Sequence, residues 1–139
     1  MKNRWALLGF MMAASAGAQP AHSEQSASPP TYVFFDWGKG ELSTDATAIL
    51  DGVAAHYLAT PELLLIDGHS DRSGSAGANL IASRKRANIA RDYLAAHGIP
   101  VSAMRVRAYG EAAPIIATAD GVREVQNRRV EIRWGDTAN

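Results

Sequence analysis

The stretch that decides the fold is Ile66-Asp67-Gly68-His69-Ser70-Asp71-Arg72-Ser73-Gly74. The apolar run 63–66 predicts a strand that is buried on both faces and is therefore central in a sheet. The glycines and serines after it predict a turn that carries Asp71. Residues 79–97 then predict a helix, which Gly98 and Pro100 end. The turn between strand and helix is therefore where a functional site is expected.

One charged side chain of this helix is predicted to face inward. With Asn79 at about 0° on a helical wheel, the other charged residues fall between about 120° and 240°. Arg86 falls near about −20°, among small and apolar side chains. Because an arginine is rarely buried without an anionic partner, Arg86 is predicted to meet a carboxylate.

We predict that Asp71 and Arg86 form a paired acid and base site for a small zwitterionic ligand. The planar guanidinium matches a carboxylate, and an aspartate accepts hydrogen bonds from an ammonium group. The turn 68–74 lets backbone approach the ligand, and the start of the helix near Asn79 adds amide donors. An alternative stays open, in which Asp71 and Arg86 pair with each other, or Arg86 pairs with Asp67 or Asp36 as a structural ion pair.

The two ends of the chain are predicted to lie outside the folded domain. Residues 1–18 are typical of a secretory signal peptide, with Lys2 and Arg4 before an apolar run and small residues up to Ala18. The run is shorter than the roughly 20 apolar residues that span a bilayer, although an uncleaved N-terminal anchor stays open. Residues 19–30 are predicted to be a disordered linker, residues 31–135 the domain, and residues 136–139 a tail.

The remaining elements predict an α/β fold. Residues 32–35, 104–109 and 129–134 are predicted to be strands, the last two with one dry and one wet face. Ser43 or Thr44 is expected to cap a helix. Its predicted core side chains are Ala46, Ile49, Leu50, Val53, Tyr57 and Leu58. The order βαβαββ predicts a two-layer sandwich, with a four-stranded mixed sheet and both helices on one face.

Composition limits the classes of function. The 139 residues carry no net charge and no cysteine, which excludes disulfides, thiolate metal sites and cysteine nucleophiles. The basic run 84–86 divides on the helical wheel, with Arg84 and Lys85 outward, so no nucleic-acid partner is expected. No cofactor is expected either.

His69, Ser70 and Asp71 have the residue types of a hydrolytic triad, but they are consecutive. Neighbouring side chains in an extended turn point apart and cannot relay a proton among themselves. A metal site that uses His69, Asp71 and a third ligand is a weaker alternative, because the other histidines have no paired spacing. We therefore expect a protein that is not an enzyme and holds no metal.

Several motifs together resemble the OmpA-like domain, the peptidoglycan-binding module of outer-membrane protein A, the peptidoglycan-associated lipoprotein and the stator protein MotB. The resemblance covers residues 32–134. It departs from the family pattern at Ser70, where threonine is usual, at Ala82, where leucine is usual, and at Lys85, where arginine is frequent. The motifs that carry it are Gly68-His69-Ser70-Asp71, Gly74, Asn79, Ser83, Arg86-Ala87, Tyr109-Gly110-Glu111, Pro114 and Asn127-Arg128-Arg129-Val130-Glu131-Ile132.

The resemblance implies non-covalent binding of peptidoglycan peptide stems through meso-diaminopimelate in the periplasm. It implies that Asp71 engages the ammonium end of this residue and Arg86 its carboxylate. Residues implied to support the pocket are Gly68, His69, Ser70, Gly74, Asn79, Ser83 and Arg129. Two alternatives stay open, namely an envelope adaptor that binds mainly another protein of a Tol-Pal, stator or secretion assembly, and a hydrolase of wall peptides.

Overall fold

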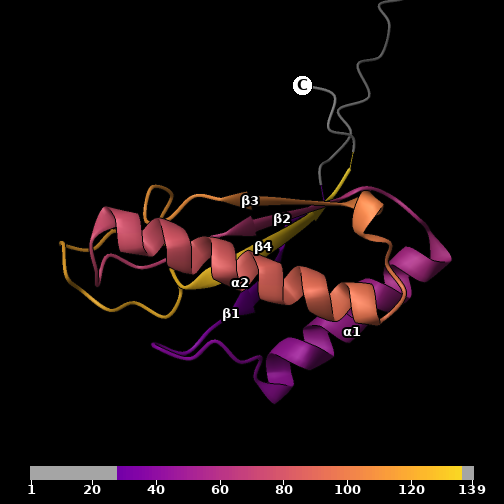
Figure 1. Cartoon of the computed structure of the whole chain (residues 1–139), viewed down its shortest axis with the longest axis horizontal. Helices are drawn as coiled ribbons and strands as arrows, with labels where there is room; N and C mark the ends of the chain where they lie inside the picture. Colours follow the sequence, from indigo (N-terminus) through magenta and orange to yellow (C-terminus); the bar gives the residue numbers. More distant parts are fainter. Residues whose placement is uncertain (1–27, 136–139) are drawn as a thin grey trace, which may run out of the picture.

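The structure is a computed structural model that describes residues 28–135. The predicted signal peptide, residues 19–27 of the predicted linker and the predicted tail lie outside the described residues. The predicted α/β class and element order are confirmed (Figure 1). In chain order the elements are β1 (Thr31–Phe34), α1 (Thr44–Ala59), β2 (Leu64–Gly68), α2 (Ala76–Ala96), the short 3-10 helix η1 (Val101–Ala103), β3 (Met104–Ala108) and β4 (Arg129–Trp134).

The four strands form one mixed sheet in the order β1-β4-β2-β3. β2 lies between β4, which runs antiparallel to it, and β3, which runs parallel to it. The central position that the apolar run 63–66 predicts for β2 is therefore confirmed, and its Leu64 and Ile66 are fully buried. β1 pairs with β4 in antiparallel orientation, so β1, β2 and β3 all run in the same direction.

Both helices contribute to one apolar core against the sheet. Leu50 and Val53 of α1 and Ala87 and Leu94 of α2 are buried with Val130 and Ile132 of β4. The predicted core face of α1 is partly wrong, because Ile49 is 37% exposed and Leu58 is 63% exposed. Ala54, which that prediction omits, is buried instead.

Each helix begins at a serine cap. The Ser43 hydroxyl accepts a hydrogen bond from the Ala46 amide, and the Ser75 hydroxyl accepts one from the Ala78 amide. The second helix therefore begins at Ala76 rather than at the predicted Asn79. The small residues of this first turn carry no apolar periodicity, so the capping serine was the available signal for the true start.

The face of β4 that carries Arg129 and Glu131 is buried, although the sequence predicts that it is exposed to solvent. Arg129 and Glu131 belong to the alternation that predicts a wet face, yet they are 3% and 5% exposed. β4 is an interior strand, and the Arg129 guanidinium donates both to Glu131 and to the carbonyl of Ala113 in the loop after β3. Because the loop covers this face and each charge has a partner, the polar side of β4 is buried.

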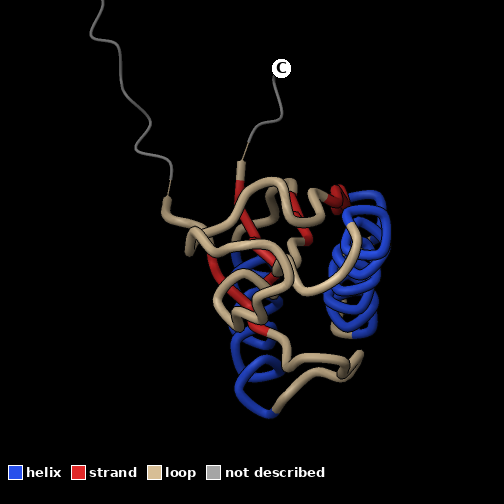
Figure 2. The backbone as a smooth tube through the Cα atoms, turned by 90° about the vertical axis from the view of Figure 1, so that its left-hand side faces the viewer, coloured by secondary structure: helices blue, strands red, loops and turns tan. Residues whose placement is uncertain are grey.

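The loops that carry the predicted site residues meet at one end of the sheet. The carboxyl ends of the three strands that share a direction lie together, and β4 begins beside them. Residues 35–43, 69–75 and 109–128 therefore gather at this end, on the left in Figure 1 and toward the viewer in Figure 2. In residues 28–135 we find no helix that combines the length and the apolar character needed to cross a membrane.

Candidate functional site

Asp71 lies at the centre of this loop end and is 2% exposed. Its Oδ1 accepts hydrogen bonds from the Ser73 amide at 3.1 Å and the Ser73 hydroxyl at 2.6 Å. Its Oδ2 accepts from the Glu124 amide at 3.1 Å and from Arg128 Nη1 at 2.7 Å. Burial alone would raise the pKa of Asp71, but these four hydrogen bonds together hold the pKa below its ordinary value. The carboxylate is therefore ionised at neutral pH.

Arg128 is the partner of Asp71 that the sequence reasoning did not select. It is 6% exposed, and its Nε donates to the carbonyl of Phe35 at 3.0 Å. The signal that could have found it is the alternation of β4. In an alternating strand, Arg128 falls on the same face as Val130 and Ile132, which face the helices. Arg129 falls on the opposite face, with Glu131 and Arg133.

Arg86 is half-buried, while Arg84 and Lys85 are exposed, as the helical wheel predicts. Its Nη1 donates to the carbonyl of His69 at 3.1 Å. Burial lowers the pKa of Arg86, the nearby Asp71 charge opposes this shift, and the Arg128 charge adds to it. Among residues 28–135, no carboxylate oxygen lies within 4.0 Å of its guanidinium, so the structural ion pairs proposed for Arg86 do not form. Asp67 instead pairs with Arg107.

A hollow of about 160 Å³ opens beside Arg86. One wall is the turn after β1, and the other wall is the α2 surface around Arg86. The small side chain of Ala82 lies in this lining. The residues that line the hollow are Gly38, Lys39, Gly40, Ala82, Lys85, Arg86 and Ile89.

Gly68 and Ser83 bring β2 and α2 into close contact. A Cβ atom at Gly68 would lie 1.9 Å from the backbone carbonyl oxygen of Ser83, so only glycine fits there. The Ser83 side chain is fully buried, and its hydroxyl accepts a hydrogen bond from the Gly110 amide at 2.9 Å. This contact places the helix that carries Arg86 directly against the end of the central strand.

His69 and Ser70 form the buried start of the turn. The His69 amide donates to the Arg129 carbonyl, and the Ser70 amide donates to the Gly110 carbonyl, both at 2.8 Å. The His69 ring stacks on Tyr109 with centroids 5.1 Å apart, and neither ring nitrogen has a hydrogen-bond partner. Burial, together with the Arg129 charge, lowers the pKa of His69 to about 4. The imidazole is therefore neutral at pH 7. Separately, the backbone carbonyl of His69 accepts the hydrogen bond that orients Arg86.

Asn79 closes the other side of the turn. It is 6% exposed, and its Nδ2 donates to the carbonyl of Gly74 at 3.2 Å and to Glu111 Oε2 at 2.7 Å. A Cβ atom at Gly74 would lie 3.2 Å from Asn79 Oδ1, so the glycine permits this close approach. Asn79 thereby ties the turn to the loop after β3.

Arg129 lies apart from Asp71 and Arg86 in its side-chain contacts. Its guanidinium binds Glu131 at 2.6 Å, and Glu131 also binds Arg133 at 2.5 Å. Its link to the site is the backbone carbonyl that accepts from His69. A supporting role for Arg129 therefore stays a prediction, and the side-chain contact with Asp71 belongs to Arg128.

Two further side chains, one buried and one half-buried, help to hold the loop 109–128 in place. Asn127 is fully buried, and its amide group bonds the backbone of Ile115 and Ile116. Arg72 donates to the carbonyl of Thr118 and forms an ion pair with Asp120. These contacts fix the loop so that the Glu124 amide reaches Asp71.

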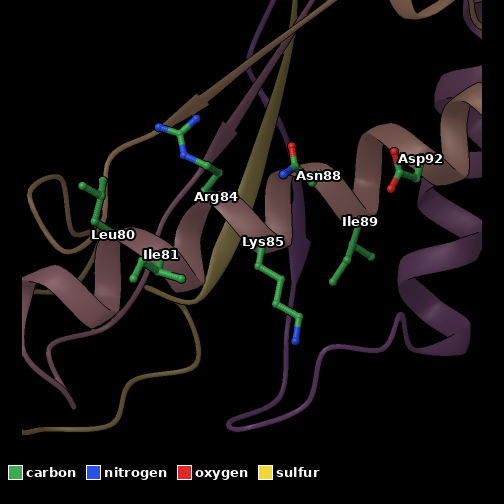
Figure 3. A pocket seen from close by; sticks show the side chains of 7 residues that line it. All are labelled: Leu80, Ile81, Arg84, Lys85, Asn88, Ile89 and Asp92. Carbon is green, nitrogen blue, oxygen red and sulfur yellow. The ribbon is translucent and has the colours of Figure 1, made fainter.

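A larger hollow of about 470 Å³ runs along the outer side of α2 (Figure 3). It contains neither Asp71 nor Arg86, and one helix supplies its whole lining, whereas the smaller hollow includes Arg86 but not Asp71. Figure 3 shows Lys85 and Ile89 pointing away from Arg84, toward the turn after β1. Because the larger hollow has no buried charged side chain in its lining, we place the site at the smaller hollow beside Arg86. The residues that line the larger hollow are Leu80, Ile81, Arg84, Lys85, Asn88, Ile89 and Asp92.

In the described part of the chain, no group of three or more histidine, aspartate or glutamate side chains is placed to hold a metal ion.

Comparison with known proteins agrees with this arrangement. A family model described as "OmpA family" matches residues 34–128, which include the turn, α2 and the Arg128 pair. The chain belongs to the OmpA family. Its relatives in that family include the peptidoglycan-associated lipoprotein of Rhizobium meliloti, which is 31% identical over 122 residues, 87% of this chain and 69% of the relative.

A second relative in the OmpA family is an outer membrane protein of Gluconacetobacter diazotrophicus, 34% identical over 107 residues. That match covers 72% of this chain but 28% of the relative. Among solved structures, the peptidoglycan-associated lipoprotein of Burkholderia pseudomallei is 27% identical with a TM-score of 0.69, covering 75% of this chain and 89% of that one. The periplasmic domain of Helicobacter pylori MotB shares the fold, with 17% identity, a TM-score of 0.64, and 81% and 80% covered.

Proposed function

We propose that this protein binds peptide stems of peptidoglycan non-covalently, through meso-diaminopimelate, in the bacterial periplasm, and so supports or anchors the cell envelope. The names of its OmpA-family relatives support the peptidoglycan partner. The observation that carries the proposal is the Arg86 guanidinium, which lines a hollow and has no carboxylate partner within residues 28–135. A half-buried cation of this kind is suited to an anion supplied by a ligand.

Arg86 offers the planar fork that a ligand carboxylate needs. Nη1 is used by the His69 carbonyl, and the remaining N–H groups of the guanidinium are available to the hollow. The His69 carbonyl therefore orients the side chain without neutralising its charge. A carboxylate of the diaminopimelate head group would complete this interaction.

Asp71 supplies the negative charge for the ammonium end. It already accepts four hydrogen bonds, two at each oxygen, so its acceptor positions are filled. The ligand ammonium would bind beside it through charge, or would take the place of the Ser73 hydroxyl, which is the neutral side-chain donor among the four. In either case the ionised state of Asp71 is what the ligand requires.

Binding without catalysis suits the groups at the site. The four donors to Asp71 stabilise its ionised form, and His69 is buried with a pKa of about 4. A general base works best when its pKa is near the working pH. Neither group is therefore poised to move a proton at neutral pH, which supports binding rather than hydrolysis.

Pull-down on purified sacculi tests the proposal, with Arg86→Ala as the variant and Arg84→Ala as its matched control. Both substitutions remove one arginine from α2, but Arg84 is exposed and points away from the turn that forms the hollow (Figure 3). We expect Arg86→Ala to abolish most of the bound protein and Arg84→Ala to leave it unchanged. Equal binding by the parent and Arg86→Ala would exclude Arg86 from the site.

An envelope adaptor is the second candidate function, and the outer side of α2 favours it. Leu80 and Ile81 are 44% and 72% exposed there, in the hollow of Figure 3. Exposed apolar side chains that lie together suit a protein partner. Purification from envelopes digested with lysozyme separates the two functions, because an adaptor keeps its protein partner after the wall is removed, whereas a wall binder is released alone.

A further inference from the structure

Trp37 lies beside the site and has no role in the chemistry described so far. It belongs to the turn between β1 and α1, the same turn that forms one wall of the hollow beside Arg86. The residue is 50% exposed. An exposed aromatic residue is not unusual by itself, so its contacts decide whether it is a binding group.

Trp37 is connected to Asp71 through one hydroxyl group. The indole Nε1–H donates to Ser73 Oγ at 3.3 Å, and this hydroxyl donates to Asp71 Oδ1 at 2.6 Å. The indole is therefore held at the edge of the charged site. A ligand whose ammonium group reaches Asp71 would pass close to the ring.

The guanidinium of Arg123 covers one face of the indole, and half of Trp37 stays exposed to solvent. The guanidinium carbon of Arg123 lies 3.4 Å from the ring centroid, a cation–π contact that fixes the ring from the loop before β4. Because half of the residue stays accessible, the indole presents a flat apolar surface, with the Ser73 hydroxyl at its Nε1 edge and the Arg123 guanidinium over one face. Flat apolar surfaces with polar margins suit the C–H face of a sugar ring, whose hydroxyls need partners at the edge.

We propose that Trp37 is a saccharide subsite, which stacks on the sugar that carries the bound peptide stem. The inference rests on the proposed function. Two residues and a lactyl group separate diaminopimelate from this sugar, a span of about 10 Å at roughly 3.3–3.6 Å per residue. The short path from Asp71 through Ser73 to Trp37 lies within that reach. The protein thus binds the peptide at Arg86 and the glycan at Trp37.

A comparison of two ligands tests the peptide subsite at Arg86 and the saccharide subsite at Trp37 independently. The first is the free tripeptide of alanine, glutamate and meso-diaminopimelate, and the second is the same tripeptide on its disaccharide. Calorimetric titration of the full chain with each ligand should show that the disaccharide improves affinity about 5–10-fold. Trp37→Ala should lose that gain and bind the free tripeptide within about 2-fold of the parent.

The matched control is Tyr32→Ala, which removes an aromatic residue that is 37% exposed on β1. It should leave both affinities unchanged, and Trp37→Phe should retain part of the gain. Equal weakening of both ligands by Trp37→Ala would overturn the inference, since the indole would then only hold Ser73 and Asp71. A parent that binds both ligands equally would also overturn it and leave the proposed function standing. A parent that binds neither would overturn both.

Discussion

The guanidinium of Arg128 lies 2.7 Å from the carboxylate of Asp71, and both side chains are more than nine-tenths buried. The two residues are 57 positions apart in the chain, so this pair joins the residue before β4 to the central turn after β2. Asp71 is therefore part of the structure that holds the loop end together, as well as a candidate ligand group. Substitutions of Asp71 affect folding and binding together, whereas substitutions of Arg86 test binding.

We predict that Arg128→Gln destabilises the protein by about 3 kcal/mol or more. The substitution leaves the ionised Asp71 buried without its counter-charge and removes the bond to the Phe35 carbonyl. Equilibrium unfolding in urea measures the change. Arg91→Gln is the control, because Arg91 pairs with the exposed Asp92 and should cost less than about 1 kcal/mol. Similar stability of the two variants would contradict the structural role of the Asp71–Arg128 pair.

Amidation of the ligand should reveal the carboxylate that Arg86 binds. We predict that the parent binds a peptide with free diaminopimelate at least about 10-fold more tightly than its amidated form, because the charge-assisted bond is lost. Arg86→Ala should bind both peptides weakly and nearly equally. A thermodynamic cycle of the two proteins and two peptides measures this coupling. If Arg86→Ala still binds the free peptide more tightly than the amidated one, the ligand carboxylate does not bind at Arg86.

His69 should make stability depend on pH between about 4 and 6.5. Its pKa in the folded protein is about 4, below the ordinary value of 6.5, so the unfolded chain binds more protons in this window. Stability therefore decreases as pH falls from 6.5 toward 4, by up to about 3 kcal/mol at about 1.4 kcal/mol per pH unit.

The check is unfolding of the parent and His69→Phe in urea at pH 7, 5.5 and 4.5. Phenylalanine keeps the stacking on Tyr109 and cannot be protonated in this range. The stability difference between the two proteins should shift in favour of the variant as pH falls. A difference that stays constant with pH would show that His69 is protonated as easily in the folded protein as in the unfolded chain.

Gly68→Ala should destabilise the protein severely, because its Cβ would lie 1.9 Å from the Ser83 carbonyl oxygen and 2.8 Å from the carbonyl carbon. Backbone atoms cannot move aside as a flexible side chain can, so α2 must shift away from β2. Gly52→Ala in α1 is the control, since nothing lies within 4 Å of that position. It should stabilise the protein by about 0.5–1 kcal/mol through helix propensity. Thermal unfolding distinguishes the two, and equal melting temperatures would disprove the close contact.

Local patterns predicted most of the architecture. The apolar run of β2, the period of α2 and the serine cap of α1 each depend on neighbours within a few residues, and each was confirmed. The half-buried position of Arg86 followed from helical geometry alone. The start of α2 was missed because its first turn consists of small residues without periodicity, and the exposed Ile49 and Leu58 show that apolar spacing does not say how much of a helix face is covered.

The sequence by itself determined the order of the elements, the turn that carries Asp71 and the side of α2 on which Arg86 lies, because these depend on short-range geometry and residue type. Tertiary structure alone decided that Asp71 pairs with Arg128, that Arg129 and Glu131 are buried together, and that Trp37 lies beside the turn. The Asp71–Arg128 and Trp37–Ser73 contacts join residues 57 and 36 positions apart, and Arg129 and Glu131 are buried by a loop that the strand pattern does not place. The physical reason is that such partners are selected by strand order and loop packing, which bring distant charges and rings to one end of the sheet.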